Sequence, residues 1–124
     1  VLACAHKPIP AFHYMVALAG GSDIPCVPYA TFGTDDLARH VAKGVKARDA
    51  ILMANHGQIA LGDTLAAALE LAFEVEVLAE QYCKLLALGS GAVHLLSDDE
   101  MRRMLVKFKS YGQKGQVERT ISAA

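Results

Sequence analysis

The chain has 124 residues, of which 53% are apolar and 6% aromatic, and its formal net charge is −1. This length is typical of a single domain with a sizeable core. The near-neutral charge excludes an electrostatic basis for binding nucleic acid or a membrane surface. No apolar segment is long enough to cross a bilayer without a charge or a helix breaker. Three widely spaced cysteines, Cys4, Cys26 and Cys83, are expected to be buried free thiols in a reducing cytoplasm.

The first quarter of the chain alternates short apolar stretches with prolines and glycines. Residues 1–6 are predicted to be the last turns of a helix, which the two prolines that follow would stop. Residues 11–19 favour a short helix that ends at a Gly-Gly turn. Residues 24–29 are predicted to be extended, and their two prolines favour a sheet edge or a connector.

Three longer segments carry helical patterns. Residues 34–46 begin with a threonine N-cap and two aspartates, and their apolar residues recur at i, i+4 and i+8. Residues 65–88 are largely apolar with a glutamate-rich side, and Gly62-Asp63-Thr64 is predicted to cap the start of this helix. Residues 97–109 begin with a capping box, Ser-Asp-Asp-Glu. A break is expected at residues 110–112, and a flexible tail over residues 113–124.

The most informative stretch is Ala50–Leu61, in which Asn55-His56-Gly57 interrupts two apolar runs. Such a run is typical of a strand buried on both faces, and the two apolar runs are predicted to form a central strand pair around His56. A histidine at its end would be held rigidly with its ring facing a cleft, and Gly57 would permit a sharp turn. A lone histidine can equally be structural, because zinc needs three or four protein ligands and no second ligand lies nearby.

Eight short sequence blocks stand out along the chain, and their order and spacing carry information together. They are Ile9–Met15, Ala19–Gly21, Ile24–Cys26, Pro28–Gly33, Asn55–Gly57, Glu74–Ala79, Leu96–Glu100 and Lys107–Gly112. Each block alone is a weak signal, but together they resemble the zinc-dependent class II aldolase family over almost the whole chain up to Tyr111.

The resemblance implies an α/β fold with a mainly antiparallel central sheet flanked by helices. Residues 1–112 would form the C-terminal portion of this single domain. It also implies a cytoplasmic, fourfold-symmetric homotetramer with active sites between neighbouring subunits.

The resemblance also implies roles for four residues. The family holds Zn²⁺ with a His-x-His pair and a third histidine in a His-Gly step, which His56 matches. The catalytic tyrosine, contributed by the neighbouring subunit, matches Tyr14. A phenylalanine lining the substrate site matches Phe32, and a tyrosine that folds over the substrate matches Tyr111. The remaining zinc ligands, the glutamate base and most phosphate contacts are expected upstream of Val1, so this chain alone should bind zinc weakly and be inactive.

The implied reaction is retro-aldol cleavage of a phosphorylated ketose resembling L-fuculose 1-phosphate to dihydroxyacetone phosphate and an aldehyde. An epimerase, dehydratase or decarboxylase on the same scaffold, or a non-catalytic scaffold, are alternatives. From the residues alone, Tyr14 could be a partly buried tyrosine with a satisfied hydroxyl, Phe32 a hydrophobic loop anchor, and Tyr111 part of a frayed helix end.

Overall fold

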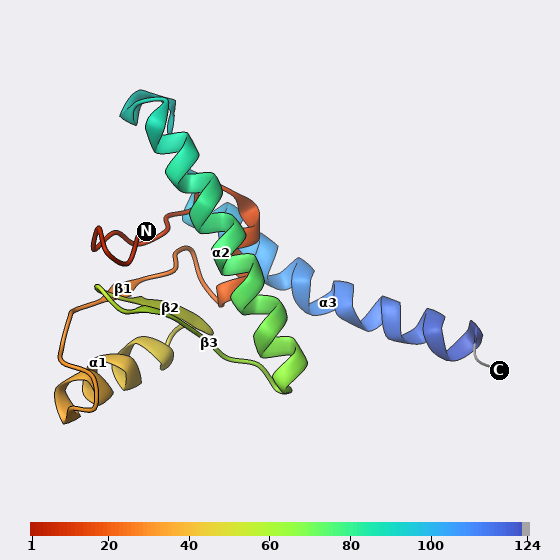
Figure 1. Ribbon diagram of the computed structural model, residues 1–124. Coiled ribbons are helices and arrows are strands. Elements are labelled where there is room, and N and C mark those ends of the chain that lie inside the picture. The colour runs from red at the N-terminus through yellow and green to blue at the C-terminus, as the bar shows by residue number, and fades with distance from the viewer. Residues whose placement is uncertain (123–124) are drawn as a thin grey trace.

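The computed structural model describes the backbone of residues 1–122 and the side chains of residues 1–110 (Figure 1). In chain order, its elements are the 3₁₀ helix η1 (Tyr14–Ala19), β1 (Cys26–Val27), α1 (Asp35–Val45), β2 (Ala50–Met53), β3 (Gly57–Ala60), α2 (Leu65–Ala87), the 3₁₀ helix η2 (Ser90–Ala92) and α3 (Asp98–Ser122). The predicted α/β class is confirmed.

The sheet has three strands in the order β1-β2-β3. β2 and β3 are antiparallel and pair Ala50 with Ala60, whereas β1 and β2 are parallel and pair Cys26 with Leu52. The sheet is therefore mixed, with four antiparallel and two parallel residue pairs. β1 lies at one edge, as the prolines around it predict.

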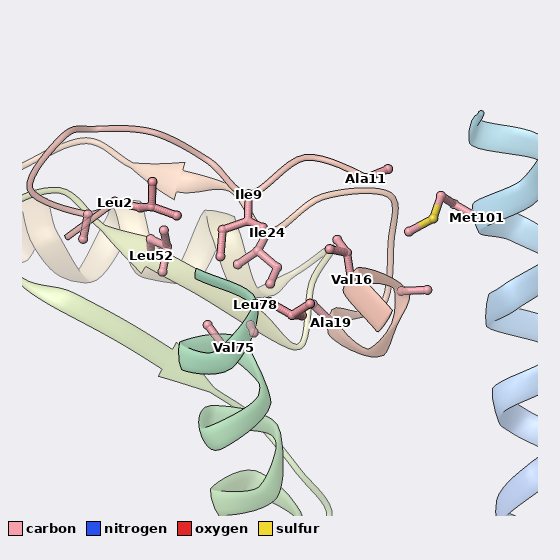
Figure 2. Packing of buried hydrophobic residues seen from close by; sticks show 13 residues of the cluster. Leu2, Ile9, Ala11, Val16, Ala19, Ile24, Leu52, Val75, Leu78 and Met101 are labelled. Carbon is pink, nitrogen blue, oxygen red and sulfur yellow. The ribbon is translucent and has the colours of Figure 1, made fainter. Parts of the chain in front are cut away.

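All four residues of β2 are buried, which confirms that this strand is covered on both faces. Because successive side chains point to opposite faces, Ala50 and Leu52 join one cluster while Ile51 and Met53 join another. Figure 2 shows the first cluster, in which Leu52 and η1 lie near Val75 and Leu78 of α2. Partly buried side chains of α1 pack against the second cluster, so α1 and α2 cover opposite faces of the sheet (Figure 1).

The three predicted helix starts are confirmed by their capping hydrogen bonds. The hydroxyl of Thr34 accepts from the Leu37 N–H at 3.4 Å, and that of Thr64 accepts from Ala67 at 3.1 Å. The hydroxyl of Ser97 accepts from the Glu100 N–H at 3.2 Å. Each cap satisfies a backbone donor that has no partner inside its helix, and this fixes where the helix begins.

Three local predictions are wrong. Residues 1–6 form turns because the Lys7 N–H closes onto the Leu2 carbonyl at 3.0 Å, and only Tyr14–Ala19 of the next predicted helix is helical, as a 3₁₀ helix. The backbone of α3 runs past the break expected at residues 110–112. There the Ser110 hydroxyl donates to the Lys107 carbonyl at 2.9 Å, inside the helix, and so does not end it. The flexible tail over residues 113–124 stays a prediction.

The cysteines Cys4, Cys26 and Cys83 are free, as predicted. Their predicted burial is wrong for Cys4, which is exposed in the N-terminal turn, and Cys26 and Cys83 are only half-buried. No helix in the part of the chain described here combines the length and apolar character needed to cross a lipid bilayer.

Candidate functional site

His56 lies in a tight turn that joins β2 to β3. The strand pairing brings Met53 opposite Gly57, and the His56 N–H donates to the Met53 carbonyl at 3.0 Å. Asn55 has a φ of 54°, a left-handed conformation that asparagine tolerates better than most residues. The strand pair predicted over Ala50–Leu61 is therefore a hairpin, in which β2 is buried and β3 only half-buried, and His56 is exposed at its tip.

Neighbouring segments anchor this turn on two sides. The Ala54 N–H donates to the Val27 carbonyl of β1 at 3.0 Å, and the Asn55 N–H donates to the Ala3 carbonyl at 3.0 Å. The imidazole of His6 also hydrogen-bonds to Asn55 through its Nε2 and the Asn55 Oδ1. The turn is thus tied to β1 and to the N-terminal turn, so the backbone of His56 has little freedom.

The described residues do not form a complete metal site. Among them, no group of three or more His, Cys, Asp or Glu side chains lies close enough to hold a metal ion. Structural and catalytic zinc sites use three or four protein ligands. An exposed imidazole on an anchored turn fits the role of one ligand in a site completed by other residues.

Tyr14 is the first residue of η1 and is held by ring contacts. His13 caps this helix, since its Nδ1 accepts the Met15 N–H at 3.1 Å, and its ring stacks on Tyr14 with centroids 4.8 Å apart. Phe108 of α3 approaches the Tyr14 ring with centroids 6.4 Å apart. With 47% of its surface exposed, Tyr14 has a fixed ring and access to a ligand.

Phe32 lies in the loop between β1 and α1 and is 79% exposed. The alternative that Phe32 anchors its loop in the core is therefore wrong. Tyr111 falls within the backbone of α3, but its side chain lies outside the described residues.

Within one chain, the candidate residues belong to separate elements. Tyr14 is on η1, Phe32 is in the loop before α1, and His56 is in the hairpin turn. Aromatic contacts among residues 1–110 do not join these three rings to one another. Within residues 1–110, the contacts of one chain therefore do not bring these three residues together.

Two residues, one beside the hairpin and one within it, were not predicted from the sequence. His6 contacts Asn55 across 49 residues, so no local pattern could reveal it. Gln58 donates through Nε2 to the Ala72 carbonyl at 2.9 Å, while its buried Oε1 has no hydrogen-bond partner among the described residues. Buried acceptors are usually paired. The signal available in the sequence was a polar side chain within an apolar run, which indicates a buried amide that needs hydrogen-bond partners.

Comparisons with known proteins connect this geometry to a family. The chain is 55% identical over 117 residues to the 5-methylthioribulose-1-phosphate/5-deoxyribulose-1-phosphate aldolase of Rhodospirillum rubrum, covering 94% of this chain and 52% of that protein. It is 55% identical over 111 residues to the L-fuculose phosphate aldolase of Haemophilus influenzae, covering 90% and 51%. A solved L-fuculose 1-phosphate aldolase superposes with a TM-score of 0.82 at 44% identity, covering 87% of this chain and 50% of that one.

The chain thus spans about half the length of the curated relatives it matches. Residues 1–83 match the family described as Class II Aldolase and Adducin N-terminal domain. This match includes η1, the hairpin turn and most of α2. The resemblance inferred from the eight sequence blocks is confirmed, and the chain belongs to the class II aldolase and adducin family.

Proposed function

We propose that this chain contributes His56 and Tyr14 to a zinc-dependent aldolase that cleaves a ketose 1-phosphate into dihydroxyacetone phosphate and an aldehyde. The observation that carries the proposal is the exposed imidazole of His56 on a hydrogen-bonded turn, at the position that matches the family's third zinc ligand. The relatives are named for L-fuculose phosphate and for 5-methylthioribulose 1-phosphate or 5-deoxyribulose 1-phosphate. The shared feature of these compounds, a phosphorylated ketose, defines the proposed substrate class.

His56 would hold the metal with one neutral imidazole, and the resemblance assigns the other ligands to a His-x-His pair outside this chain. When bound, zinc supplies Lewis-acid stabilisation of the negative charge that develops as the carbon–carbon bond breaks. The contribution of this chain is rigidity, because the buried β2 and the hydrogen bonds of the turn fix the backbone of His56. A fixed ligand reduces the reorganisation needed during the reaction.

Tyr14 would move the proton at the aldehyde oxygen. Its hydroxyl would give a proton to that oxygen when the carbon–carbon bond forms, and the resulting phenolate would take the proton back when the bond breaks, a contribution on the order of 10²–10⁴-fold. The contacts of its ring with His13 and Phe108 favour this role, since they orient the phenol while leaving it accessible. Phe32 would line the substrate site with its exposed ring, and Tyr111 would fold over the substrate.

The proposal includes a cytoplasmic homotetramer with active sites between subunits. Tyr14 and His56 lie on separate elements, and no ring contact joins them among the described residues, which supports sites shared between subunits. An exposed apolar stripe on α2, formed by Leu65, Leu69 and Phe73, supports the assembly. Such a stripe is costly to leave in water and is typical of a surface covered in an assembly. Analytical ultracentrifugation of an active chimera between this chain and the Haemophilus influenzae L-fuculose phosphate aldolase tests the tetramer, and a monomeric active species would contradict it.

The activity is tested in a chimera in which this chain replaces the matching half of the Haemophilus influenzae L-fuculose phosphate aldolase. Release of dihydroxyacetone phosphate is followed with L-fuculose 1-phosphate and with 5-methylthioribulose 1-phosphate. We expect zinc-dependent cleavage of at least one of them, which His56→Ala abolishes and Tyr14→Phe lowers by about 10²–10⁴-fold.

Two substitutions of exposed residues serve as matched controls. His94→Ala and Tyr29→Phe remove the same chemical groups elsewhere on the surface and should leave the cleavage rate unchanged. Equal losses in His56→Ala and His94→Ala, or in Tyr14→Phe and Tyr29→Phe, would refute the assignment. The isolated chain should bind zinc only weakly, and tight stoichiometric binding in a zinc titration would contradict the expectation that other ligands are needed.

A further inference from the structure

Two strained residues meet at the base of the candidate metal ligand. Within the described residues, His6 and Asn55 are the two non-glycine residues with positive φ, at 53° and 54°. An L-residue pays a steric cost in this left-handed conformation. Such strain persists where surrounding contacts over-determine the backbone, and it is often found at functional sites. The strain lies in two turns that are far apart in the sequence but adjacent in space (Figure 1).

The contacts between the two turns converge on one carbonyl group. The Ala3 carbonyl accepts the N–H of His6 at 3.1 Å and the N–H of Asn55 at 3.0 Å. The side chains of His6 and Asn55 add a third hydrogen bond between the two turns. The Asn55 Oδ1 can only accept, so the His6 Nε2 donates. Three hydrogen bonds thus hold the two left-handed residues against each other.

The N-terminal turn is itself anchored in the core. Leu2 is 3% exposed and Ala3 is 8% exposed, and both belong to the cluster that contains Leu52 of β2 (Figure 2). His6 and Asn55, in contrast, are exposed. A hydrogen bond between exposed side chains adds little to global stability, so the effect of this one should be local to the residue that follows Asn55.

We propose that His6 is a positioning residue for His56, acting through Asn55 to hold the hairpin turn in the conformation that presents the imidazole. This inference rests on the proposed role of His56 as a metal ligand. His6 itself does not bind the metal. It supplies a clamp that keeps the His56 backbone ordered before any ligand arrives, so that little order has to be gained on binding.

The test measures backbone order by NMR ¹⁵N relaxation on the 124-residue chain at pH 7, without metal. In the native chain, the backbone order parameters of Asn55 and His56 should be about 0.85, and His6→Ala should lower the order parameters of both residues below about 0.6. Asn55→Gly should have the same effect on His56, because glycine accepts the left-handed φ without strain but lacks the acceptor oxygen. His6→Gln keeps an N–H donor at a similar reach and should restore the order of the turn.

A role confined to general stability would give a different pattern. We expect the urea midpoint of unfolding to be unchanged in His6→Ala and the order parameters of β2 to stay at their native values. Unchanged order at His56, loss of order spread through the sheet with a lower midpoint, or failure of His6→Gln to restore the turn would each overturn the proposal.

A second measurement links the clamp to the metal. In the chimera described above, His6→Ala should weaken zinc binding by about tenfold, the low end of what outer residues around a metal contribute, and His94→Ala should not. Equal zinc affinity in both variants would overturn the proposal. If instead His56→Ala leaves zinc binding intact, the proposed function fails, and the NMR result still reports whether the clamp orders the turn.

Discussion

The close approach of α1 to the sheet allows a prediction with a definite sign. A Cβ added at Gly44 would lie 2.9 Å from Val27 Cγ1 and 3.2 Å from two side-chain atoms of Ile51. Alanine is favoured over glycine inside a helix by about 0.8–1.0 kcal/mol, but overpacking a core typically costs about 1–3 kcal/mol. We therefore expect Gly44→Ala to lower the free energy of unfolding by up to about 2 kcal/mol, although propensity alone predicts a gain.

Urea denaturation followed by circular dichroism measures this difference. Ala42→Gly, at an exposed position of the same helix, is the control, and it should cost about 0.8–1.0 kcal/mol from propensity alone. Val27→Ala removes the atom that the new methyl group would strike. In that background the loss caused by Gly44→Ala should shrink by about 1 kcal/mol or more, since residues in contact are not additive.

A stabilisation of about 1 kcal/mol by Gly44→Ala that Val27→Ala leaves unchanged would contradict the close packing of α1 on the sheet. Such a result would mean that α1 stands further from β2 than the structure has it. The packing of α1 matters for the candidate site because α1 covers one face of β2, and β2 leads directly into the turn that carries His56.

Two further predictions concern the core and a thiol. Leu78→Ala removes a side chain that is 2% exposed and should cost about 2–5 kcal/mol of unfolding free energy. Glu76→Ala, at an exposed position of the same helix, should change it by less than about 0.5 kcal/mol. Similar losses in the two variants would contradict the packing described for α2. Burial raises the pKa of the Cys26 thiol, so at pH 8 iodoacetamide should label exposed Cys4 before Cys26, and equal rates would contradict this. Because the folded chain keeps the Cys26 proton to higher pH than the unfolded chain, the stability that this thiol contributes should be lost as the pH rises through its raised pKa.

Features that depend on neighbouring residues were predictable from the sequence. Thr34, Thr64 and Ser97 each bond to a backbone N–H three residues later, so the signal for a helix start and its cause lie in the same short segment. The burial of β2 followed from a short apolar run, because a strand covered on both faces needs apolar side chains on both.

Features that depend on distant contacts were not predictable. The run over Ala50–Leu61 does not reveal that Asn55 adopts a left-handed φ, since that choice is supported by Ala3 and His6 about 50 residues away. The contact of Tyr14 with Phe108 likewise requires the docking of α3 beside η1. The candidate roles of Tyr14 and His56 came from the family resemblance, because a lone tyrosine or histidine carries no metal-site spacing of its own.

The role of His56 as a metal ligand is tested most directly by the zinc content of the purified chimera. After dialysis against metal-free buffer, the native chimera should retain about one zinc ion per chain, as a site with three histidine ligands does. His94→Ala should retain the same amount, and His56→Ala should lose most of it while keeping its circular dichroism spectrum. Zinc retained by the His56→Ala chimera at the level of the native protein would contradict the account.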